Sequence, residues 1–222
     1  MKIGIIGSGK FGLVLARIAV ENGNEVSIYS RRQAEVDSLN KFNESLSGFS
    51  FEGHEISATL DPSELEQCEV LFVTVASKDF REFIKKINYK SQNGKFVSCA
   101  KGFDVVTGKL MTEVLTDDFS IDSRNVFALS GPNLSKELEN RELTGTVIAG
   151  EDSVFIDSLS KALKTKYFIP FTNKDRFGVE LGGALKNIYA ILSGYFHKKG
   201  VGENTIGLLL TKCLSEMLSL IH

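Results

Sequence analysis

The sequence is poor in cysteine and histidine, with three of each among its 222 residues. Cys68, Cys99 and Cys213 lie far apart, form no CxxC pair and have no histidine cluster near them. Neither a disulfide framework nor a zinc site is indicated, so we expect no metal. Few and separated cysteines fit a reducing compartment, and we expect a cytoplasmic location.

Neither sign of charge dominates the chain. It has 26 basic and 28 acidic residues and a formal net charge of -2. This balance gives no overall attraction to nucleic acid or to an anionic membrane. We therefore expect neither as a partner.

Long hydrophobic runs are absent as well. The first apolar run is only a few residues long and is interrupted by glycine, which is too short for a secretory signal or a membrane span. We expect no targeting segment and no integral membrane segment. The chain is nevertheless 42% hydrophobic, enough to bury a real core.

The chain does contain a regular alternation of short β-branched runs and helical stretches. This pattern predicts a Rossmann-like α/β fold with a doubly wound, mostly parallel sheet covered by helices. The polar stretch 41–55 is expected to be a loop or weak hairpin. The expected strands are 3–6, 25–29, 70–75, 96–99, 126–129, 146–150 and 167–171, and the expected helices are 13–21, 79–87, one from Leu134, and 154–163.

The character of the sequence changes near Lys174. Residues 177–196 read as a long apolar helix in which only Glu180 and Lys186 are charged, and a second apolar helix is expected over 206–221. We therefore expect a sheet domain over 1–173, followed by a partial all-helical second domain over 174–222.

The N-terminal segment carries a glycine fingerprint, Gly7-Ser8-Gly9-Lys10-Phe11-Gly12, between an expected strand and an expected helix. In such a turn the first glycine permits the tight bend, the second lets the backbone approach a pyrophosphate, and the third lets the helix pack against the strand. The helix N-terminus then favours the phosphate. We predict a dinucleotide cofactor here, with a purely structural glycine turn as the alternative.

The end of the second expected strand reads Tyr29-Ser30-Arg31-Arg32. An acidic residue at this place would accept hydrogen bonds from the ribose of NAD, whereas an arginine can hold the 2′-phosphate of NADP. Two guanidinium groups without an acid favour NADP over NAD. The alternative is that both arginines are solvated surface residues.

The lysine at position 186 stands in the apolar helix beside small residues. Positions three, four, seven and eight away include Gly182, Gly183, Ala190, Ser193 and Gly194, and we expect Leu181, Leu185, Ile188 and Leu192 to form the face that buries the helix. Two adjacent glycines cost about 1 kcal/mol each inside a helix, so some neighbour requires the space. Spacing alone leaves two interpretations open, a lysine extending to solvent or a cation at the floor of a cleft.

Two expected strand ends carry further polar groups. One reads Cys99-Ala100-Lys101-Gly102, and the other reads Leu129-Ser130-Gly131-Pro132-Asn133. Ligands of doubly wound sheets bind beyond the carboxyl ends of strands, so these groups can converge on one site. Taken singly, each motif is better explained by a surface lysine or by an ordinary Gly-Pro turn.

Together these motifs resemble the NAD(P)-dependent glycerol-3-phosphate dehydrogenases of the bacterial type. The resemblance rests on the glycine fingerprint, on "AKG" at 100–102, "LSGPN" at 129–133 and "GVGENT" at 200–205, and most specifically on "GVELGGALKNIYAI" at 178–191. It implies an oxidoreductase that interconverts dihydroxyacetone phosphate and sn-glycerol 3-phosphate for phospholipid synthesis.

The resemblance also implies a role for each matching residue. Lys186 corresponds to the catalytic lysine that protonates the carbonyl oxygen or removes the hydroxyl proton. The implied substrate-binding residues are Lys101, Gly131, Asn133 and Asn187, although asparagine at 133 replaces the usual serine. The implied cofactor-binding residues are Gly7, Ser8, Gly9, Lys10, Phe11, Gly12, Arg31, Arg32, Lys101 and Ser135.

The sequence departs from the family in two respects. The family's "NPxYLPG" stretch has no counterpart in 41–55, and the chain stops at His222 where the family continues with further substrate-binding segments. We therefore expect a C-terminally short chain whose last helix exposes a face that can pair in a homodimer. The alternative functions are a degenerate or truncated nucleotide-binding protein without efficient catalysis, and a related reductase of a small keto acid.

Overall fold

The computed structural model describes residues 1–87 and 94–221. It has an eight-stranded sheet with the strand order β3-β2-β1-β4-β5-β6-β7-β8. Every neighbouring pair is parallel except β6 and β7, which run antiparallel. The predicted doubly wound, mostly parallel sheet is confirmed. The strands are β1 (Lys2–Ile6), β2 (Glu25–Tyr29), β3 (Ser57–Thr59), β4 (Val70–Val73), β5 (Lys95–Ser98), β6 (Val126–Ser130), β7 (Thr144–Ala149) and β8 (Phe168–Asn173).

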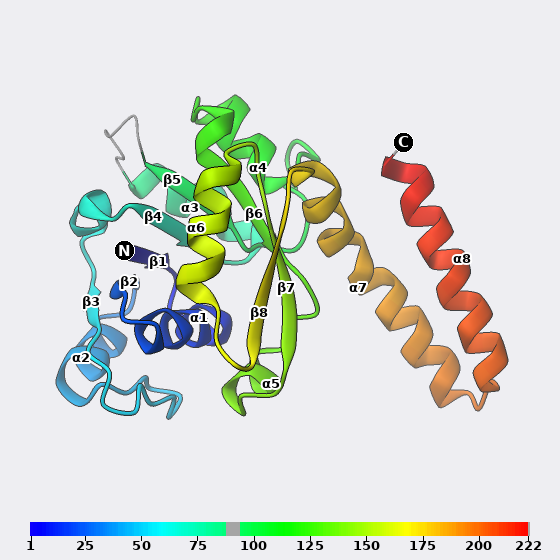
Figure 1. Ribbon diagram of the computed structural model, residues 1–222, viewed down its shortest axis with the longest axis horizontal. Coiled ribbons are helices and arrows are strands. Elements are labelled where there is room, and N and C mark those ends of the chain that lie inside the picture. The colour runs from blue at the N-terminus through cyan, green and yellow to red at the C-terminus, as the bar shows by residue number, and fades with distance from the viewer. Residues whose placement is uncertain (88–93, 222) are drawn as a thin grey trace.

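Helices connect the strands, as the sequence alternation predicts. Figure 1 shows them packed around the sheet, with α1 and α6 in the foreground. The α-helices are α1 (Lys10–Glu21), α2 (Gln33–Phe42), α3 (Ser77–Lys86), α4 (Met111–Glu113), α5 (Ser135–Glu139), α6 (Ser153–Leu163), α7 (Arg176–Lys198) and α8 (Glu203–Ile221). Shorter turns are the 3-10 helices η1 (Pro62–Gln67) and η3 (Ser123–Asn125) and the π-helix η2 (Val114–Asp118).

The core consists of two main apolar layers, one on each face of the sheet. Alternate strand residues point to opposite faces, so Ile5 and Phe72 pack with α1 and α6 while Ile6 and Leu71 pack with α3. The segment 41–55 carries the end of α2 and a single antiparallel bridge between Glu44 and Ser50, in agreement with the loop or weak hairpin that we expected.

The two C-terminal helices extend away from the sheet. Figure 1 shows α7 leaving the last strands and α8 running back beside it. The expected burial of the Leu181, Leu185, Ile188 and Leu192 face is correct only at its beginning, because Leu181 is buried whereas Ile188 and Leu192 are exposed. Only the first turns of α7 lie against the sheet domain, with Leu181 and Ala184 on Leu110, so the later apolar side chains have no sheet to cover them. The sequence segment proposed as the second domain, 174–222, includes His222, which lies outside the described residues.

Candidate functional site

The glycine fingerprint forms the turn between β1 and α1. Gly7 has a positive φ of 108°, which glycine adopts without strain, and its N–H donates to the Tyr29 carbonyl. Gly12 is packed so tightly that an added Cβ would lie 2.3 Å from the Gly7 carbonyl oxygen. At Gly9 an added Cβ would meet nothing within 4 Å. The backbone at Gly9 therefore borders open space, as a cradle for a pyrophosphate requires.

This turn is fixed by the ends of the two neighbouring strands. The Thr74 hydroxyl, directly after β4, reaches the Ile6 and Gly7 carbonyl oxygens at 3.0 and 3.2 Å. The Ser8 and Ser30 hydroxyls lie 2.8 Å apart and so join the turn to the end of β2. Thr74 therefore stabilises the glycine turn, although the sequence motif did not predict a role for this residue.

The two arginines after β2 line the same hollow as the glycines. This hollow has a volume of about 290 Å³, and its wall includes Gly7, Ser8, Gly9, Arg31 and Arg32. Arg31 lies over the Phe83 ring at 4.5 Å and reaches Glu82 at 3.5 Å, while Arg32 pairs with Glu35 at 3.1 Å. Both guanidinium groups thus have partners, yet both remain exposed at the rim of the hollow.

The predicted lysine pair converges at the carboxyl edge of β5 and β6. The Lys186 ammonium donates to the Gly131 carbonyl oxygen at 2.6 Å, and the Lys101 ammonium reaches the same oxygen at 3.5 Å. Lys186 is half-buried, and burial together with the neighbouring Lys101 charge lowers its pKa to about 8. The Lys186 ammonium is therefore held at the Gly131 carbonyl oxygen and does not extend freely to solvent.

Asn133 lies beside this carbonyl oxygen. Its amide donates to the Thr146 hydroxyl at 3.0 Å, and its backbone N–H donates to the Gly131 carbonyl oxygen at 2.9 Å. Its Oδ1 is buried and, among the described residues, has no hydrogen-bond partner. A buried acceptor without a donor is costly, so Asn133 is suited to a ligand that donates.

The remaining predicted residues occupy three different places. Lys10 and Phe11 open α1, where Lys10 is exposed and Phe11 packs partly against the core. Ser135 begins the short helix α5. Asn187 follows Lys186 on α7 and is exposed. Gly131 and Asn133 lie at the lysine pair, because both ammonium groups and the Asn133 N–H contact the Gly131 carbonyl oxygen.

The helix that carries Lys186 approaches the sheet through its small residues. An added Cβ on Gly183 would lie 2.1 Å from the Ser130 hydroxyl oxygen, whereas Gly182 and Gly194 face open space. A side chain therefore fits at Gly182, whereas one at Gly183 would require the Ser130 hydroxyl to turn away. Glu180, which the sequence marked only as a rare charge in an apolar helix, is buried and accepts hydrogen bonds from Ser98 and Thr112.

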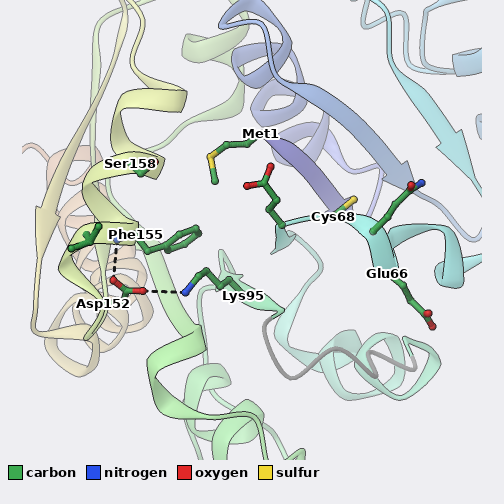
Figure 2. Close-up of a pocket in the computed structure, with 10 residues that line it drawn as sticks. Met1, Glu66, Cys68, Lys95, Asp152, Phe155 and Ser158 are labelled. Carbon is green, nitrogen blue, oxygen red and sulfur yellow. Dashed lines mark hydrogen bonds and ion pairs between the residues drawn. The ribbon is translucent and has the colours of Figure 1, made fainter.

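A larger hollow of about 560 Å³ lies at the opposite edge of the sheet, near the amino ends of β1, β4 and β5. Figure 2 shows Lys95 directed toward Asp152 on one side of it and Cys68 and Glu66 on the other. Lys95 pairs with Asp152 at 3.1 Å and lies 4.5 Å over the Phe155 ring, so its charge already has partners. Ligands of doubly wound sheets bind at the other edge, and the glycine turn and the lysine pair lie there.

The described residues contain neither a metal-binding cluster nor a membrane-spanning helix. Over 1–87 and 94–221, no group of three or more histidine, cysteine or acidic side chains is placed to hold a metal ion. Within the same residues, no helix has the length and apolar character needed to cross a bilayer.

The sheet order and the glycine turn define a protein of the Rossmann class, whose glycine loops are typical of dinucleotide-binding domains. Comparison of the sequence with known families then gives a specific assignment. Residues 2–156 match the N-terminal model and residues 175–222 match the C-terminal model of NAD-dependent glycerol-3-phosphate dehydrogenase. The chain belongs to this family, as the sequence motifs predicted.

Individual relatives agree with this assignment. The chain is 38% identical over 219 residues to the glycerol-3-phosphate dehydrogenase [NAD(P)+] of Ectopseudomonas mendocina, covering 97% of this chain and 64% of that protein. It is 36% identical over 219 residues to the enzyme of the same name from Pseudomonas savastanoi, covering 97% and 63%. The chain thus spans somewhat less than two thirds of the length of these curated relatives.

Solved structures resemble it in fold. A glycerol-3-phosphate dehydrogenase from Coxiella burnetii superposes with a TM-score of 0.86 at 27% identity, covering 99% of this chain and 68% of the other. One from Plasmodium falciparum gives 0.87 at 23% identity, covering 98% and 64%, and supports the fold alone.

Proposed function

We propose that this chain is the cofactor-binding and catalytic-lysine part of a glycerol-3-phosphate dehydrogenase that reduces dihydroxyacetone phosphate to sn-glycerol 3-phosphate. The observation that carries the proposal is the convergence of Lys186 and Lys101 on the Gly131 carbonyl oxygen, at the same sheet edge as the glycine turn. Family membership supports the reaction, and the free backbone at Gly9 fits the cofactor.

The lysine pair accounts for the chemistry at the carbonyl carbon. A reduced nicotinamide supplies a hydride when bound. As negative charge develops on the substrate oxygen, the Lys186 ammonium stabilises it and donates the proton, and in the reverse direction the neutral amine removes the hydroxyl proton. A pKa near 8 suits both tasks at neutral pH.

We propose that the substrate lies against Lys101, Gly131, Asn133 and Asn187. The unpaired Oδ1 of Asn133 accepts from a substrate hydroxyl, a bond that the usual serine would make with a shorter side chain. Lys101 contributes a second positive charge that attracts a phosphorylated substrate. Because the two ammonium groups lie on one carbonyl oxygen, substrate oxygen atoms can replace that contact without large movement.

We propose NADP as the preferred cofactor over NAD. Arg31 and Arg32 stand at the end of β2, where the 2′-phosphate of a bound dinucleotide lies. Glu35 is buried and forms an ion pair with Arg32. This ion pair holds the Arg32 guanidinium at the rim of the hollow that contains the glycine turn. The rest of the proposed cofactor set is Gly7, Ser8, Gly9, Lys10, Phe11, Gly12, Lys101 and Ser135.

The remaining proposals concern setting and assembly. We place a sheet domain at 1–173 and a helical part at 174–222. We place the chain in the cytoplasm, because few and widely separated cysteines fit a reducing compartment, and we propose that the product supplies phospholipid synthesis there. We also propose a homodimer. Ile188, Ile191 and Tyr195 form an exposed apolar stripe on α7, which a second copy can cover.

A nucleotide-binding protein without efficient turnover is the second candidate. It is favoured by the exposed apolar side chains of α7 and α8, which nothing among the described residues covers. A related reductase of a small keto acid would use the same lysine.

One experiment separates these possibilities. Absorbance of NADPH and NADH is followed with dihydroxyacetone phosphate and with small keto acids, on this chain and on a chain extended to the relatives' length. Oxidation of NADPH by dihydroxyacetone phosphate supports the dehydrogenase. Cofactor binding without turnover by either chain supports the second candidate instead.

A further inference from the structure

One buried charge in the sheet-facing turns of α7 has no part in the proposed reaction. Glu180 is only 3% exposed and precedes Lys186 by six residues, somewhat less than two helical turns. The Ser98 hydroxyl donates to its Oε1 at 3.1 Å, the Thr112 backbone N–H donates to the carboxylate at 3.2 Å, and the Thr112 hydroxyl donates to Oε2 at 2.5 Å. Both carboxylate oxygens are thus hydrogen-bonded.

These donors belong to the segments that present the other half of the site. Ser98 is the last residue of β5 and precedes Lys101 by three residues. Thr112 lies in α4, two residues after Leu110, which packs against Leu181. The Glu180 carboxylate therefore ties the helix that carries Lys186 directly to the strand end that leads to Lys101.

The lysine pair requires such a connection. Two ammonium groups that share the Gly131 carbonyl oxygen repel one another, so flexible elements would let them separate. Gly183 brings α7 against Ser130, and Arg176 anchors the start of the helix on the Ser123 and Val126 carbonyl oxygens. Glu180 lies between these two contacts along the helix, on the side of β5.

A buried carboxylate at this position lowers the stability of the fold, because burying its charge costs free energy. Burial raises the pKa of Glu180, because its charged form is poorly solvated there, and the hydrogen bonds from Thr112 and Ser98 and the charge of Arg176 only partly offset this. Apolar side chains of similar volume often stabilise a fold as well as a buried charge does. An apolar side chain cannot accept hydrogen bonds from Ser98 and Thr112. These hydrogen bonds fix the position of α7 relative to β5 and α4.

We propose that Glu180 is a positioning residue that holds Lys186 against Lys101 by accepting hydrogen bonds from Ser98 and Thr112. The inference rests on the proposed function for the roles of the two lysines. It adds a residue that touches neither substrate nor cofactor and acts through α7.

The test measures the lysine pair directly and does not depend on turnover. Lysines of the full chain are reductively methylated with ¹³C, which keeps their charge, and their pKa values are followed by NMR. Lys186→Arg and Lys101→Arg identify the two signals. The variants are Glu180→Leu, which removes the acceptors, Glu180→Gln, which keeps one acceptor and the reach, and Ser98→Ala, which removes one donor. Glu35→Gln, at an equally buried carboxylate on α2, is the matched control.

In the unmodified sequence we expect Lys186 to titrate near pH 8, because burial and the Lys101 charge lower its pKa to about that value. We expect Glu180→Leu to raise that pKa by about one unit or more as the lysines separate, Ser98→Ala to raise it by less, and Glu180→Gln to restore most of the difference. Glu35→Gln leaves it unchanged. Cooperative thermal unfolding confirms that each variant is folded, and Ser98→Ala decides the question if Glu180→Leu does not fold.

The outcomes separate the two proposals. A pKa near 8 that persists in folded Glu180→Leu and in Ser98→Ala overturns the role of Glu180 and leaves the proposed function standing. A pKa near 10.5 for Lys186 in the unmodified sequence contradicts both the role of Lys186 as a proton donor with a lowered pKa and the role of Glu180 in holding it near Lys101. A chain with the expected shifts but no turnover supports Glu180 and counts against the dehydrogenase.

Discussion

The Lys186 ammonium and the Gly131 carbonyl oxygen lie 2.6 Å apart, although 55 residues separate them in sequence. The contact joins a helix that leaves the sheet to the turn that follows β6. It places a positive charge at the sheet edge where the glycine turn also lies.

Removing the amine abolishes the proton transfer. Lys186→Ala is expected to lower turnover with dihydroxyacetone phosphate by roughly 10²- to 10⁴-fold, because general acid catalysis contributes about that much. NADPH binding should change little, since the glycine turn is untouched. Steady-state absorbance measures the first quantity and fluorescence titration the second. Lys198→Ala, at the exposed end of the same helix, is the control, and turnover that survives in Lys186→Ala excludes this lysine from the mechanism.

The pH dependence has a defined sign. Burial and the Lys101 charge lower the pKa of Lys186 to about 8, so the ammonium is present below that pH and the neutral amine above it. Ketone reduction needs the proton and is expected to fall as pH rises through about 8, whereas alcohol oxidation needs the free amine and is expected to rise. Rates of both directions across pH profiles test this. Two flat profiles over that range would contradict the assignment.

Cofactor choice depends on the arginines after β2. Arg31→Ala and Arg32→Ala are each expected to weaken NADPH binding by about 10- to 100-fold, the loss of one charge-assisted contact of about 1.5–3 kcal/mol. NADH binding should be nearly unaffected, because NADH lacks the 2′-phosphate. Titration with both cofactors gives the ratio. Arg124→Ala, an exposed arginine paired with Asp122, serves as control, and equal losses for NADH and NADPH would rule out phosphate recognition.

Two glycines of the fingerprint should fail in different ways. Gly12→Ala forces a Cβ to within 2.3 Å of the Gly7 carbonyl oxygen and is expected to cost about 1–3 kcal/mol of stability. Gly9→Ala meets nothing in the protein, so its thermal midpoint should hardly change while nucleotide binding is lost. Thermal unfolding and cofactor titration on both variants distinguish them. Unimpaired nucleotide binding by Gly9→Ala would mean that no pyrophosphate approaches there.

The apolar stripe of α7 predicts self-association. The chain is expected to sediment as a dimer at micromolar concentration, and Ile191→Glu, which places a charge at a side chain that is 75% exposed, to shift it to monomer. Val154→Glu, at an equally exposed apolar residue on α6, should leave the dimer intact. A chain that sediments as a monomer at every concentration would refute the proposal.

Some of the fold could be read directly from the sequence, and some could not. Short apolar runs predicted the strands β1 and β4 because buried parallel strands are continuously apolar. The strand β3 has only three residues, Ser57–Thr59, and carries no such run. The burial of Ile188 and Leu192 was expected from their helical spacing and is wrong, since periodicity shows that a helix has an apolar face but not whether anything covers it.

Local chemistry could be predicted from the amino-acid sequence alone: a glycine turn of the right spacing, a pair of arginines after the second strand, and a lysine among small residues. Each of these features depends on residues within a few positions of one another, so it can be predicted from the sequence. Three contacts became visible only in the folded chain. Lys186 contacts Gly131, Glu180 contacts Ser98, and a side chain at Gly183, unlike one at Gly182, would collide with Ser130. Such contacts join segments tens of residues apart, and their geometry is fixed by how the helices pack on the sheet.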